Sequence, residues 1–326
     1  MRVVEYDHYG DPSVLQLRDR EPPAIRPGKI LVRVRAAALN PKDVLSRAGK
    51  YPWLAGRHFP KRVGYDWSGE AVAIGAGVRD IREGDALFGM IESWSGGACA
   101  ELVLVSPKEC ATKPRALGWP EAAAIPLAAS TALQALRDVG GVRNGDRVLV
   151  NGASGGVGVF AIQIAKALGA HVTTLTSATN RELAHSLGAD ETLDYRAWDA
   201  ASASTTYDTF FDVFGNRNYR EIRPLLSSRG TFVSTVPKRH VLLAQLRTLF
   251  SRPRARLVMV RSRRADLEWL AAATSRGVLR AVIDRTWPLS EVAEAQRYVA
   301  SKRARGKVVI TVREDGDQKF AEIDET

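Results

Sequence analysis

The first third of the chain carries the hydrophobic pattern of β-strands. In KILVRVRAAAL (29–39) apolar residues alternate with charged ones, as in a strand that buries one face. Shorter apolar runs follow, and Gly-Asp and Gly-Gly pairs typical of turns separate them. These runs are GEAVAIGAGV (69–78), GDALFGM (84–90) and AELVLVS (100–106). We therefore expect a β-rich unit at the N-terminus.

From residue 118 the pattern changes to apolar residues spaced three and four apart, which predicts helix over 118–140. Units of strand followed by helix then recur, which predicts a parallel sheet with helices on both faces. The expected strands are RVLVN (147–151), HVTTLT (171–176), ETLDY (191–195), TFFDVFG (209–215) and GTFVSTV (230–236). GKVVITV (306–312) is again strand-like and could return to the first unit. The pattern as a whole indicates an α/β protein.

Composition narrows the class of protein. A chain of 326 residues is long enough for two domains, and 45% hydrophobic with 25% charged residues is ordinary for a globular protein. No apolar run approaches the roughly 18 residues of a membrane helix, and the N-terminus lacks an apolar signal core. Two cysteines exclude a disulfide framework. We expect a cytoplasmic protein without a membrane partner.

One segment concentrates positive charge. Residues 238–264 carry nine Lys or Arg and no acid, within a chain of net charge +11. The interpretation that we favour is an amphipathic helix with a solvated basic face. Two others remain open: a site for an anionic substrate tail, such as a carrier- or coenzyme-A-linked thioester, or an RNA-binding surface. A nucleic-acid partner is not our first expectation.

Three glycines stand where the strand 147–151 turns into the next helix. Gly152, Gly155 and Gly158 form a GxxGxxG spacing, a variant of the dinucleotide-binding fingerprint. Such a turn needs a residue without Cβ, an open approach for a pyrophosphate, and close packing of helix on strand. The helix N-terminus then attracts the phosphate charge. We assign Gly152, Ser154, Gly155, Gly156, Val157 and Gly158 to cofactor binding.

The end of the second strand indicates which nucleotide binds. An NAD site places an acid about 20 residues on, where it accepts from the ribose 2′-hydroxyl. Here TLTSATNR (174–181) has no acid, and it offers Ser177, Asn180 and Arg181 as donors for a 2′-phosphate. The alternative is that Arg181 only begins a solvated helix. We predict NADPH as the cofactor.

With these residues in hand, the chain resembles the zinc-independent quinone reductase and enoyl reductase branch of the medium-chain dehydrogenase/reductases. The similarity covers nearly the whole chain and is carried by AAALNPKDVLSRAGKYP (36–52), GYDWSGEAVAIGAGV (64–78), GGACAELVLV (96–105), EAAAIPLAASTALQAL (121–136), VLVNGASGGVGVFAIQIAKALGAHV (148–172), LGADETLDY (187–195) and ARGKVVI (304–310).

This resemblance implies an α/β fold in which a Rossmann doubly wound parallel sheet is joined to a β-rich GroES-like catalytic domain. It divides the chain into the catalytic domain (1–120), an NADP-binding domain (121–285) and a C-terminal return to the catalytic domain (286–326). Active sites of this family lie between the two domains.

A zinc ion is not expected. Catalytic zinc needs about three ligands from His, Cys or carboxylates. The segments that supply a Cys and a His-Glu pair in zinc-dependent relatives read Asn40-Pro41-Lys42-Asp43 and Gly64-Tyr65-Asp66 here, and the cysteine-rich structural lobe is missing. The five histidines are not paired with cysteine at ligand spacing.

Without a Lewis acid, hydrogen-bond donors must stabilise the oxyanion that hydride addition creates. By resemblance, Tyr51 lies near the substrate and is the candidate proton donor, although it could be a packed aromatic in a turn. Asn40 could donate through its amide or hold the Asn-Pro turn. Lys42 is a third candidate catalytic residue, and Tyr65 a weaker one.

Further cofactor contacts are carried over by position. Thr131 resembles a residue against the nicotinamide, and Tyr195 one at the adenosine end. At later strand ends, backbone usually holds the carboxamide, and ligands of open α/β sheets bind at those ends. The residues concerned are Phe214, Gly215, Thr235 and Val236.

The leading functional hypothesis is an NADPH-dependent reductase of small quinones or α,β-unsaturated carbonyls. The alternatives are an enoyl-thioester reductase of fatty acid or polyketide metabolism, and an NADPH-binding protein with an RNA-binding role. A homodimer is expected by resemblance, formed by pairing outer strands of two Rossmann sheets, here near GTFVSTV (230–236).

Overall fold

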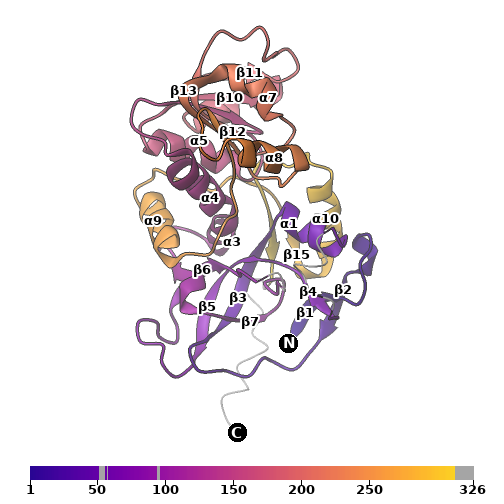
Figure 1. Ribbon diagram of the computed structural model, residues 1–326. Helices are drawn as coiled ribbons and strands as arrows, with labels where there is room; N and C mark the ends of the chain where they lie inside the picture. The colour runs from indigo at the N-terminus through magenta and orange to yellow at the C-terminus, as the bar shows by residue number, and fades with distance from the viewer. Residues whose placement is uncertain (51–55, 57, 94–95, 313–326) are drawn as a thin grey trace. The chain divides into compact units, whose positions relative to one another are not determined.

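The strand-rich first third folds into two antiparallel sheets in the computed structural model, which describes residues 1–50, 56, 58–93 and 96–312 (Figure 1). The chain divides into two compact units. Unit 1 comprises 1–124, 285–303 and the chain from 308 on, and unit 2 comprises 125–284 and 304–307.

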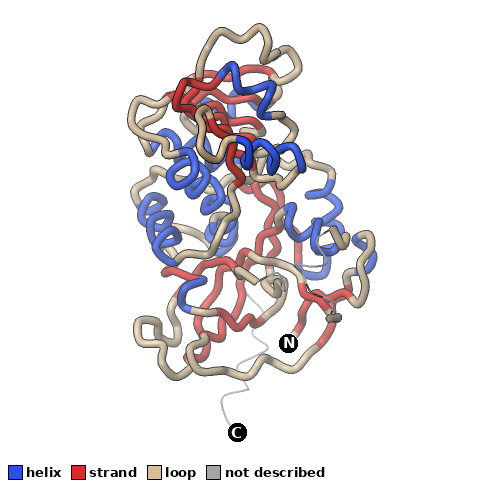
Figure 2. The backbone as a smooth tube through the Cα atoms, in the orientation of Figure 1, coloured by secondary structure: helices blue, strands red, loops and turns tan. Residues whose placement is uncertain are grey.

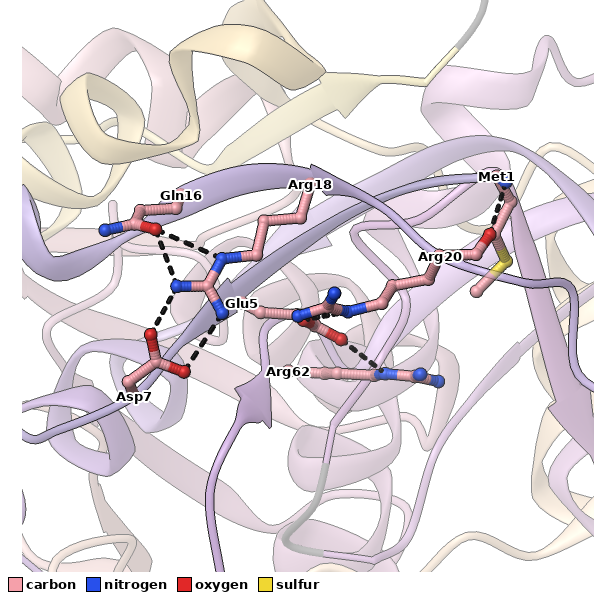
Figure 3. Close-up of polar contacts among 7 residues, drawn as sticks. All are labelled: Met1, Glu5, Asp7, Gln16, Arg18, Arg20 and Arg62. Carbon is pink, nitrogen blue, oxygen red and sulfur yellow. Dashed lines mark hydrogen bonds and ion pairs between the residues drawn. The ribbon is translucent and has the colours of Figure 1, made fainter.

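The smaller sheet of unit 1 has the strand order β2-β1-β4. Its bounds are β1 (Arg2–Tyr6), β2 (Gln16–Asp19) and β4 (Lys61–Arg62). Glu5 is almost fully buried and takes part in ion pairs with Arg20 at 3.0 Å and with Arg62 at 3.3 Å (Figure 3). Because a buried carboxylate is costly without partners, these two guanidinium groups fix the register of three short strands.

Close beside this pairing, Arg18 of β2 ties down the chain that leaves β1. Its guanidinium donates to the carboxylate of Asp7 and to Gln16 (Figure 3). The N-terminal amine of Met1 donates to the carbonyl of Arg20 at 2.6 Å. The start of the chain is thus held in the sheet.

The larger sheet of unit 1 has the order β15-β16-β3-β5-β6-β8, with β7 also paired to β3. Its strands are β3 (Ile30–Leu39), β5 (Asp66–Ile74), β6 (Ala86–Met90), β7 (Leu102–Val105), β8 (Cys110–Thr112), β15 (Ile283–Pro288) and β16 (Lys307–Thr311). The closing strand β16 runs antiparallel to β3, with Val309 opposite Ala38. This is the return strand that the apolar run near the C-terminus indicated.

Unit 2 contains one parallel sheet with the order β11-β10-β9-β12-β13-β14. Strands are drawn in red in Figure 2. Its strands are β9 (Arg147–Asn151), β10 (His171–Thr176), β11 (Glu191–Asp194), β12 (Tyr207–Asp212), β13 (Leu226–Ser234) and β14 (Arg254–Leu257). Counted along the chain within the sheet, this order is 3-2-1-4-5-6, that of the doubly wound dinucleotide fold. The expected fold class is confirmed.

The helices follow the 3.6-residue pattern, and the helix over 118–140 is divided at Ile125-Pro126. The α-helices are α1 (Pro41–Arg47), α3 (Trp119–Ala124), α4 (Pro126–Leu133), α5 (Gly158–Ala167), α6 (Arg181–Ser186), α7 (Tyr219–Ile222), α8 (Arg239–Arg247), α9 (Arg264–Ser275) and α10 (Val292–Ala300). A π-helix extends α4 over Gln134–Gly140. Single 3-10 turns are η1 (Pro12–Val14), η2 (Pro107–Glu109), η4 (Ala178–Asn180), η5 (Arg223–Leu225) and η6 (Leu289–Glu291).

The expected docking strand is not at the edge of the sheet. β13 lies between β12 and β14, and β14 forms the outer edge. That edge is already covered, since the N–H groups of Ala255 and Leu257 donate to Thr248 Oγ1 at 2.9 Å and Gln245 Oε1 at 2.7 Å. The prediction that 230–236 offers an unpaired edge is wrong, because the short strand that follows α8 escaped the sequence analysis.

The basic segment also differs from the favoured interpretation. Its first part forms the expected helix α8, and Val241 and Ala244 are buried. The outward side is leucine-rich, however, with Leu242, Leu243 and Leu246 exposed. A solvated basic face therefore describes only part of this helix.

No helix among the described residues has the length and apolarity needed to span a bilayer.

Candidate nucleotide and reduction sites

The glycine turn has the geometry of a pyrophosphate cradle. Gly152 has a φ of +84°, a conformation that favours glycine. A Cβ on Gly158 would lie 2.2 Å from the carbonyl oxygen of Gly152, so only glycine lets α5 begin so close to β9. A Cβ on Gly155 would meet nothing closer than 3.5 Å. The packing of the turn therefore does not require glycine at position 155. The missing side chain leaves open space there.

The carboxyl ends of the central strands bring polar residues to one edge of the sheet. Asn151 of β9 lies opposite Asp212 of β12, and Asp212 lies opposite Ser234 of β13. The strand order reverses between β9 and β12, and ligands of doubly wound sheets bind at such a switch point. Register thus places the glycine turn and the loops after β12 and β13 at the same edge.

Asp212 organises the loop that follows β12. Its fully buried carboxylate accepts from Asn151 Nδ2 at 2.7 Å and from the N–H groups of Gly215 and Arg217 at 2.9 and 3.1 Å. Burial raises the pKa of this carboxyl, and the hydrogen bonds that it accepts act against that rise. Sequence analysis missed this role, although a polar residue ending each of two neighbouring apolar strands was a signal.

Two of the predicted carboxamide-binding loops do come together. A Cβ on Gly215 would lie 2.3 Å from Val236 Cγ2, and Thr235 Oγ1 donates to the carbonyl of Val213 at 2.9 Å. Phe214 is half exposed, and its Cβ lies 3.1 Å from where a Gly152 Cβ would stand. Phe214 therefore covers the start of the glycine turn.

The residues expected to bind a 2′-phosphate lie beside the glycine turn. Asn180 Nδ2 donates to Ser154 Oγ at 3.0 Å, while its buried Oδ1 has no partner among the described residues. The hydroxyls of Ser177 and Thr179 are 2.9 Å apart. Arg181 opens α6, its side chain is exposed, and its guanidinium has no hydrogen-bond or ion-pair partner in the described part of the chain. The chemistry of these side chains suits a ribose that carries a 2′-phosphate.

Tyr195 lies beside the end of β10, and the closing segment contacts the glycine turn. Tyr195 N–H donates to the carbonyl of Thr176, which directly precedes Ser177, and its ring is half exposed. The N–H of Gly306 donates to the carbonyl of Ser154 at 2.9 Å. Sequence analysis did not connect the closing segment with the glycine turn, because no local pattern reports a contact across 150 residues.

A polar hollow of about 440 Å³ opens next to this group. Thr179, Asn180, Asp284 and Arg305 are among the residues that line it. Arg305 is exposed and is the arginine that lines this hollow together with Asn180. Thr131 is not joined to these residues by any hydrogen bond in the described chain, since its hydroxyl donates to the Leu127 carbonyl within α4 at 2.7 Å.

Unit 1 holds a second cluster of buried polar side chains. Asn40 Nδ2 donates to Asp66 Oδ2 at 2.9 Å and to the carbonyl of Ala38 at 3.3 Å. Asp43 accepts from the N–H groups of Asn40 and Gly64, both at 2.8 Å. The amide of Asn40 is thus already engaged, which favours its role in holding the Asn-Pro turn. The sequence analysis named the two buried acids only as members of the segments 40–43 and 64–66 and gave neither a role.

Lys42 lies over an aromatic ring in this cluster. Its ammonium is 3.7 Å from the centre of the Tyr65 ring, a cation–π contact. Burial lowers the pKa of Lys42 to about 8, and the nearby carboxylates, Asp43 foremost, act in the opposite direction. The Tyr65 hydroxyl lies 3.1 Å from Ser46 Oγ, and burial raises the pKa of its phenol. At neutral pH Lys42 is therefore the more acidic donor of the two.

Tyr51 lies outside the described residues, so its position adds nothing to this cluster. Among the residues that the structure does describe, no group of three or more His, Cys, Asp or Glu is arranged to hold a metal ion. The segments Asn40-Pro41-Lys42-Asp43 and Gly64-Tyr65-Asp66, which by resemblance stand where zinc-dependent relatives carry ligands, contain neither Cys nor His.

Known proteins match both halves of the chain. Residues 26–125 match the alcohol dehydrogenase GroES-like domain, and residues 187–310 match a zinc-binding dehydrogenase domain. A chloroplast envelope quinone oxidoreductase homolog of Arabidopsis thaliana is 30% identical over 322 residues, covering 95% of this chain and 98% of the relative. A mitochondrial NAD(P)H oxidoreductase of Mus musculus is 33% identical over 347 residues, covering 94% and 88%.

The fold has a similarly extensive match. The quinone oxidoreductase of Coxiella burnetii superposes with a TM-score of 0.89 at 32% identity, over 96% of this chain and 99% of that one. The chain therefore belongs to the medium-chain dehydrogenase/reductase family, in its quinone oxidoreductase branch. It is an oxidoreductase that works with a nicotinamide cofactor.

Proposed function

We propose that this protein is an NADPH-dependent reductase of quinones or α,β-unsaturated carbonyls that needs no metal. The observation that carries the choice of cofactor is the unpaired guanidinium of Arg181, which follows Ser177 and Asn180 at the end of a strand segment (174–181) that contains no acid. The names of the relatives support the substrate class. Unit 2 would bind NADPH, and unit 1 would supply the catalytic side chains.

The nicotinamide supplies a hydride when bound, and the protein must then stabilise and protonate an enolate-like oxygen. We assign that donation to the ammonium of Lys42, whose pKa of about 8 keeps it protonated yet acidic near neutrality. The Tyr65 ring holds the ammonium, and Asn40 with Asp66 fixes the start of α1. Tyr51 remains a second proposed donor to the same oxygen.

Metal independence belongs to the same proposal. A hydrogen-bonding ammonium can stabilise the oxyanion in place of a Lewis acid. The acids around Asn40, Asp43 and Asp66, already accept hydrogen bonds from protein groups. We expect elemental analysis to find no stoichiometric zinc, and chelators to leave turnover intact. Bound zinc together with chelator-sensitive turnover would overturn this part.

The function is tested with purified protein and a panel of quinones, enones and enoyl thioesters. NADPH oxidation is followed at the nicotinamide absorbance band, with NADH in parallel. Turnover of quinones or enones with NADPH preferred supports the proposal. Turnover of thioesters alone would favour enoyl-thioester reduction, and no turnover with salt-sensitive RNA retention would favour the binding protein.

We also propose a cytoplasmic location and a homodimer, both carried over from the sequence. With the outward N–H groups of β14 engaged by Thr248 and Gln245, such a dimer would need a surface other than the sheet edge. Light scattering at micromolar concentration measures the assembly against the chain mass of 35.6 kDa.

A further inference from the structure

Helix α8 presents an apolar face away from the protein. Its buried positions Val241, Ala244 and Thr248 lie along one side. Residues 242, 243 and 246 fall on the opposite side of a helix with 3.6 residues per turn, and all three are leucines. Their exposed fractions are 41%, 49% and 68%.

The apolar surface continues past the helix end. Leu249 is 51% exposed and Phe250 is 97% exposed. Single exposed leucines are common on protein surfaces, whereas contiguous exposed apolar residues mark an interaction site. We call Leu242, Leu243, Leu246, Leu249 and Phe250 the leucine face.

The segment that carries this face is firmly attached to unit 2. Val241 and Ala244 pack in the same core cluster as Phe232 of the sheet. Besides the two hydrogen bonds that cover β14, Arg256 donates to the carbonyls at the end of α8, Thr248 at 3.3 Å and Leu249 at 3.3 Å. The exposure therefore belongs to an anchored helix, the orange helix labelled α8 in Figure 1.

Positive charge borders the leucine face without neutralising partners. Lys238, Arg239 and Arg247 are exposed, and none has a carboxylate partner among the described residues. The chain contains no Asp or Glu from residue 222 to residue 265. A partner that complements this surface must combine negative charge with an apolar layer within a few ångströms of it.

We propose that the leucine face docks on the surface of an anionic lipid bilayer. Leucine and phenylalanine side chains would enter the boundary between headgroups and acyl chains, while the bordering Lys and Arg bind lipid phosphates. This is peripheral attachment by an amphipathic helix. The sequence-based expectation of no membrane partner considered only spanning helices and signal segments. The proposal does not depend on the substrate.

Two other occupants fit the surface less well. Single-stranded nucleic acid would use the cations, but stacking on bases needs aromatic rings, and the face offers four leucines and one phenylalanine. A second copy would bring the same uncompensated cations against each other, and the sheet edge beside α8 is already covered. A bilayer matches both the charge and the apolar side chains.

The test is co-sedimentation of the full chain with vesicles. One set is phosphatidylcholine alone, and in the other about one third of the lipid is phosphatidylglycerol. We expect binding at least about tenfold stronger to the anionic set, weakened by salt but not abolished. Absence of binding to the anionic set would overturn the proposal.

Paired variants separate the two contributions. Leu246→Ser with Phe250→Ser should reduce partitioning about tenfold or more, and Arg239→Gln with Arg247→Gln should remove the preference for anionic lipid. The matched controls, Leu17→Ser with Val278→Ser and Arg220→Gln with Arg276→Gln, change exposed residues elsewhere and should bind as wild type. Thermal midpoints and NADPH affinity verify that each variant is folded.

A site-specific label reports insertion directly. Cys99 and Cys110 are buried, so a Phe250→Cys variant can be labelled selectively with an environment-sensitive dye. Its emission should shift to the blue with anionic vesicles and be quenched by brominated acyl chains, whereas a dye at Ile25→Cys should do neither.

Three further results would overturn the proposal. In the first, wild type and both double variants bind vesicles equally well. In the second, the protein binds no vesicles but retains RNA in a way that requires Arg239 and Arg247. In the third, it binds no vesicles, and wild type has twice the chain mass whereas the Leu246/Phe250 variant is a monomer. Catalysis is read separately with a water-soluble quinone, so failure of the reductase assignment leaves the vesicle result unaffected.

Discussion

Two cations carry the chemistry proposed for this protein, and their surroundings differ. Arg181 is exposed and has no partner in the described chain, so its guanidinium is available to a ligand. Lys42 is partly buried over the Tyr65 ring, and its pKa falls to about 8. An available guanidinium suits permanent phosphate binding, whereas a lysine of lowered pKa suits proton transfer.

Arg181 should decide between the two nicotinamide cofactors. Hydrogen bonds to charged groups are worth about 1.5–3 kcal/mol each, so Arg181→Ala should weaken NADPH by about 10- to 100-fold and barely affect NADH. Ser177→Asp should go further, because the new carboxylate repels the 2′-phosphate and accepts from a ribose hydroxyl. The measurement is kcat/KM with both cofactors.

Arg276→Ala, an exposed arginine of the same unit, is the control and should leave the preference unchanged. A wild type that prefers NADH would contradict the assignment. Equal loss for both cofactors in Arg181→Ala would transfer the phosphate role to Arg305, which lines the neighbouring hollow.

Lys42 should give the enone reaction its pH dependence. As pH rises through about 8 the ammonium loses its proton, so kcat/KM should fall above that pH. Lys42→Met should lower kcat for enones by about 10²-fold or more, and NADPH affinity should be unaffected. Lys42→Arg keeps the charge at all accessible pH values and should flatten the profile.

Exposed Lys50, mutated to Met, is the matched control for this series. Quinones should suffer less, because solvent can protonate a hydroquinone. An unchanged pH profile in Lys42→Met would remove this residue from proton transfer and leave Tyr51 as the candidate.

At the level of secondary-structure elements, the turn between β9 and α5 separates packing from ligand binding. A Cβ on Gly158 would press on the Gly152 carbonyl at 2.2 Å, whereas one on Gly155 would fit in the protein alone. Two glycines three residues apart therefore have different reasons to be glycine.

Alanine variants should show that difference. Gly158→Ala should destabilise unit 2 by about 1–3 kcal/mol, a typical cost of overpacking. Gly155→Ala should leave the thermal midpoint near wild type but weaken NADPH at least about tenfold, since its methyl occupies the space for the pyrophosphate. Calorimetry and cofactor titration measure both effects. Tight NADPH binding by Gly155→Ala would place the pyrophosphate elsewhere.

On the scale of the whole molecule, the residues that we propose for cofactor binding lie in unit 2, which also contains the closing segment 304–307. A ligand that binds only folded unit 2 stabilises it by mass action, about 2.7 kcal/mol at a concentration of 100 Kd. NADPH should therefore raise the unfolding midpoint of this unit by about 5–11 °C.

The Arg181→Ala variant should show this shift only at higher NADPH concentrations, while its response to NADH stays as in wild type. Hydrogen exchange should show protection at the end of β9 and around Asn180. Protection confined to unit 1 would contradict the division of roles between the units.

The sequence alone determined the local chemistry. Alternation with a period of two gave β3 and its neighbours, and recurring strand–helix units gave the parallel sheet, because side-chain burial imposes those periods directly. The glycine spacing and the acid-free strand end led to the proposed nucleotide site, since backbone freedom and charge are properties of single residues.

Only the tertiary structure decided what depends on distant contacts. Asn40 and Asp66 form a hydrogen bond across 26 residues, and the contact of Gly306 with the glycine turn spans more than 150. No periodicity reports such pairs, because strand register and chain return are set by packing of the whole core. For the same reason, β14 and the outward leucines of α8 could be identified only from the folded structure. Packing against the core decides which side of an amphipathic helix faces inward. In α8, Val241 and Ala244 pack in the core, and the leucines are exposed.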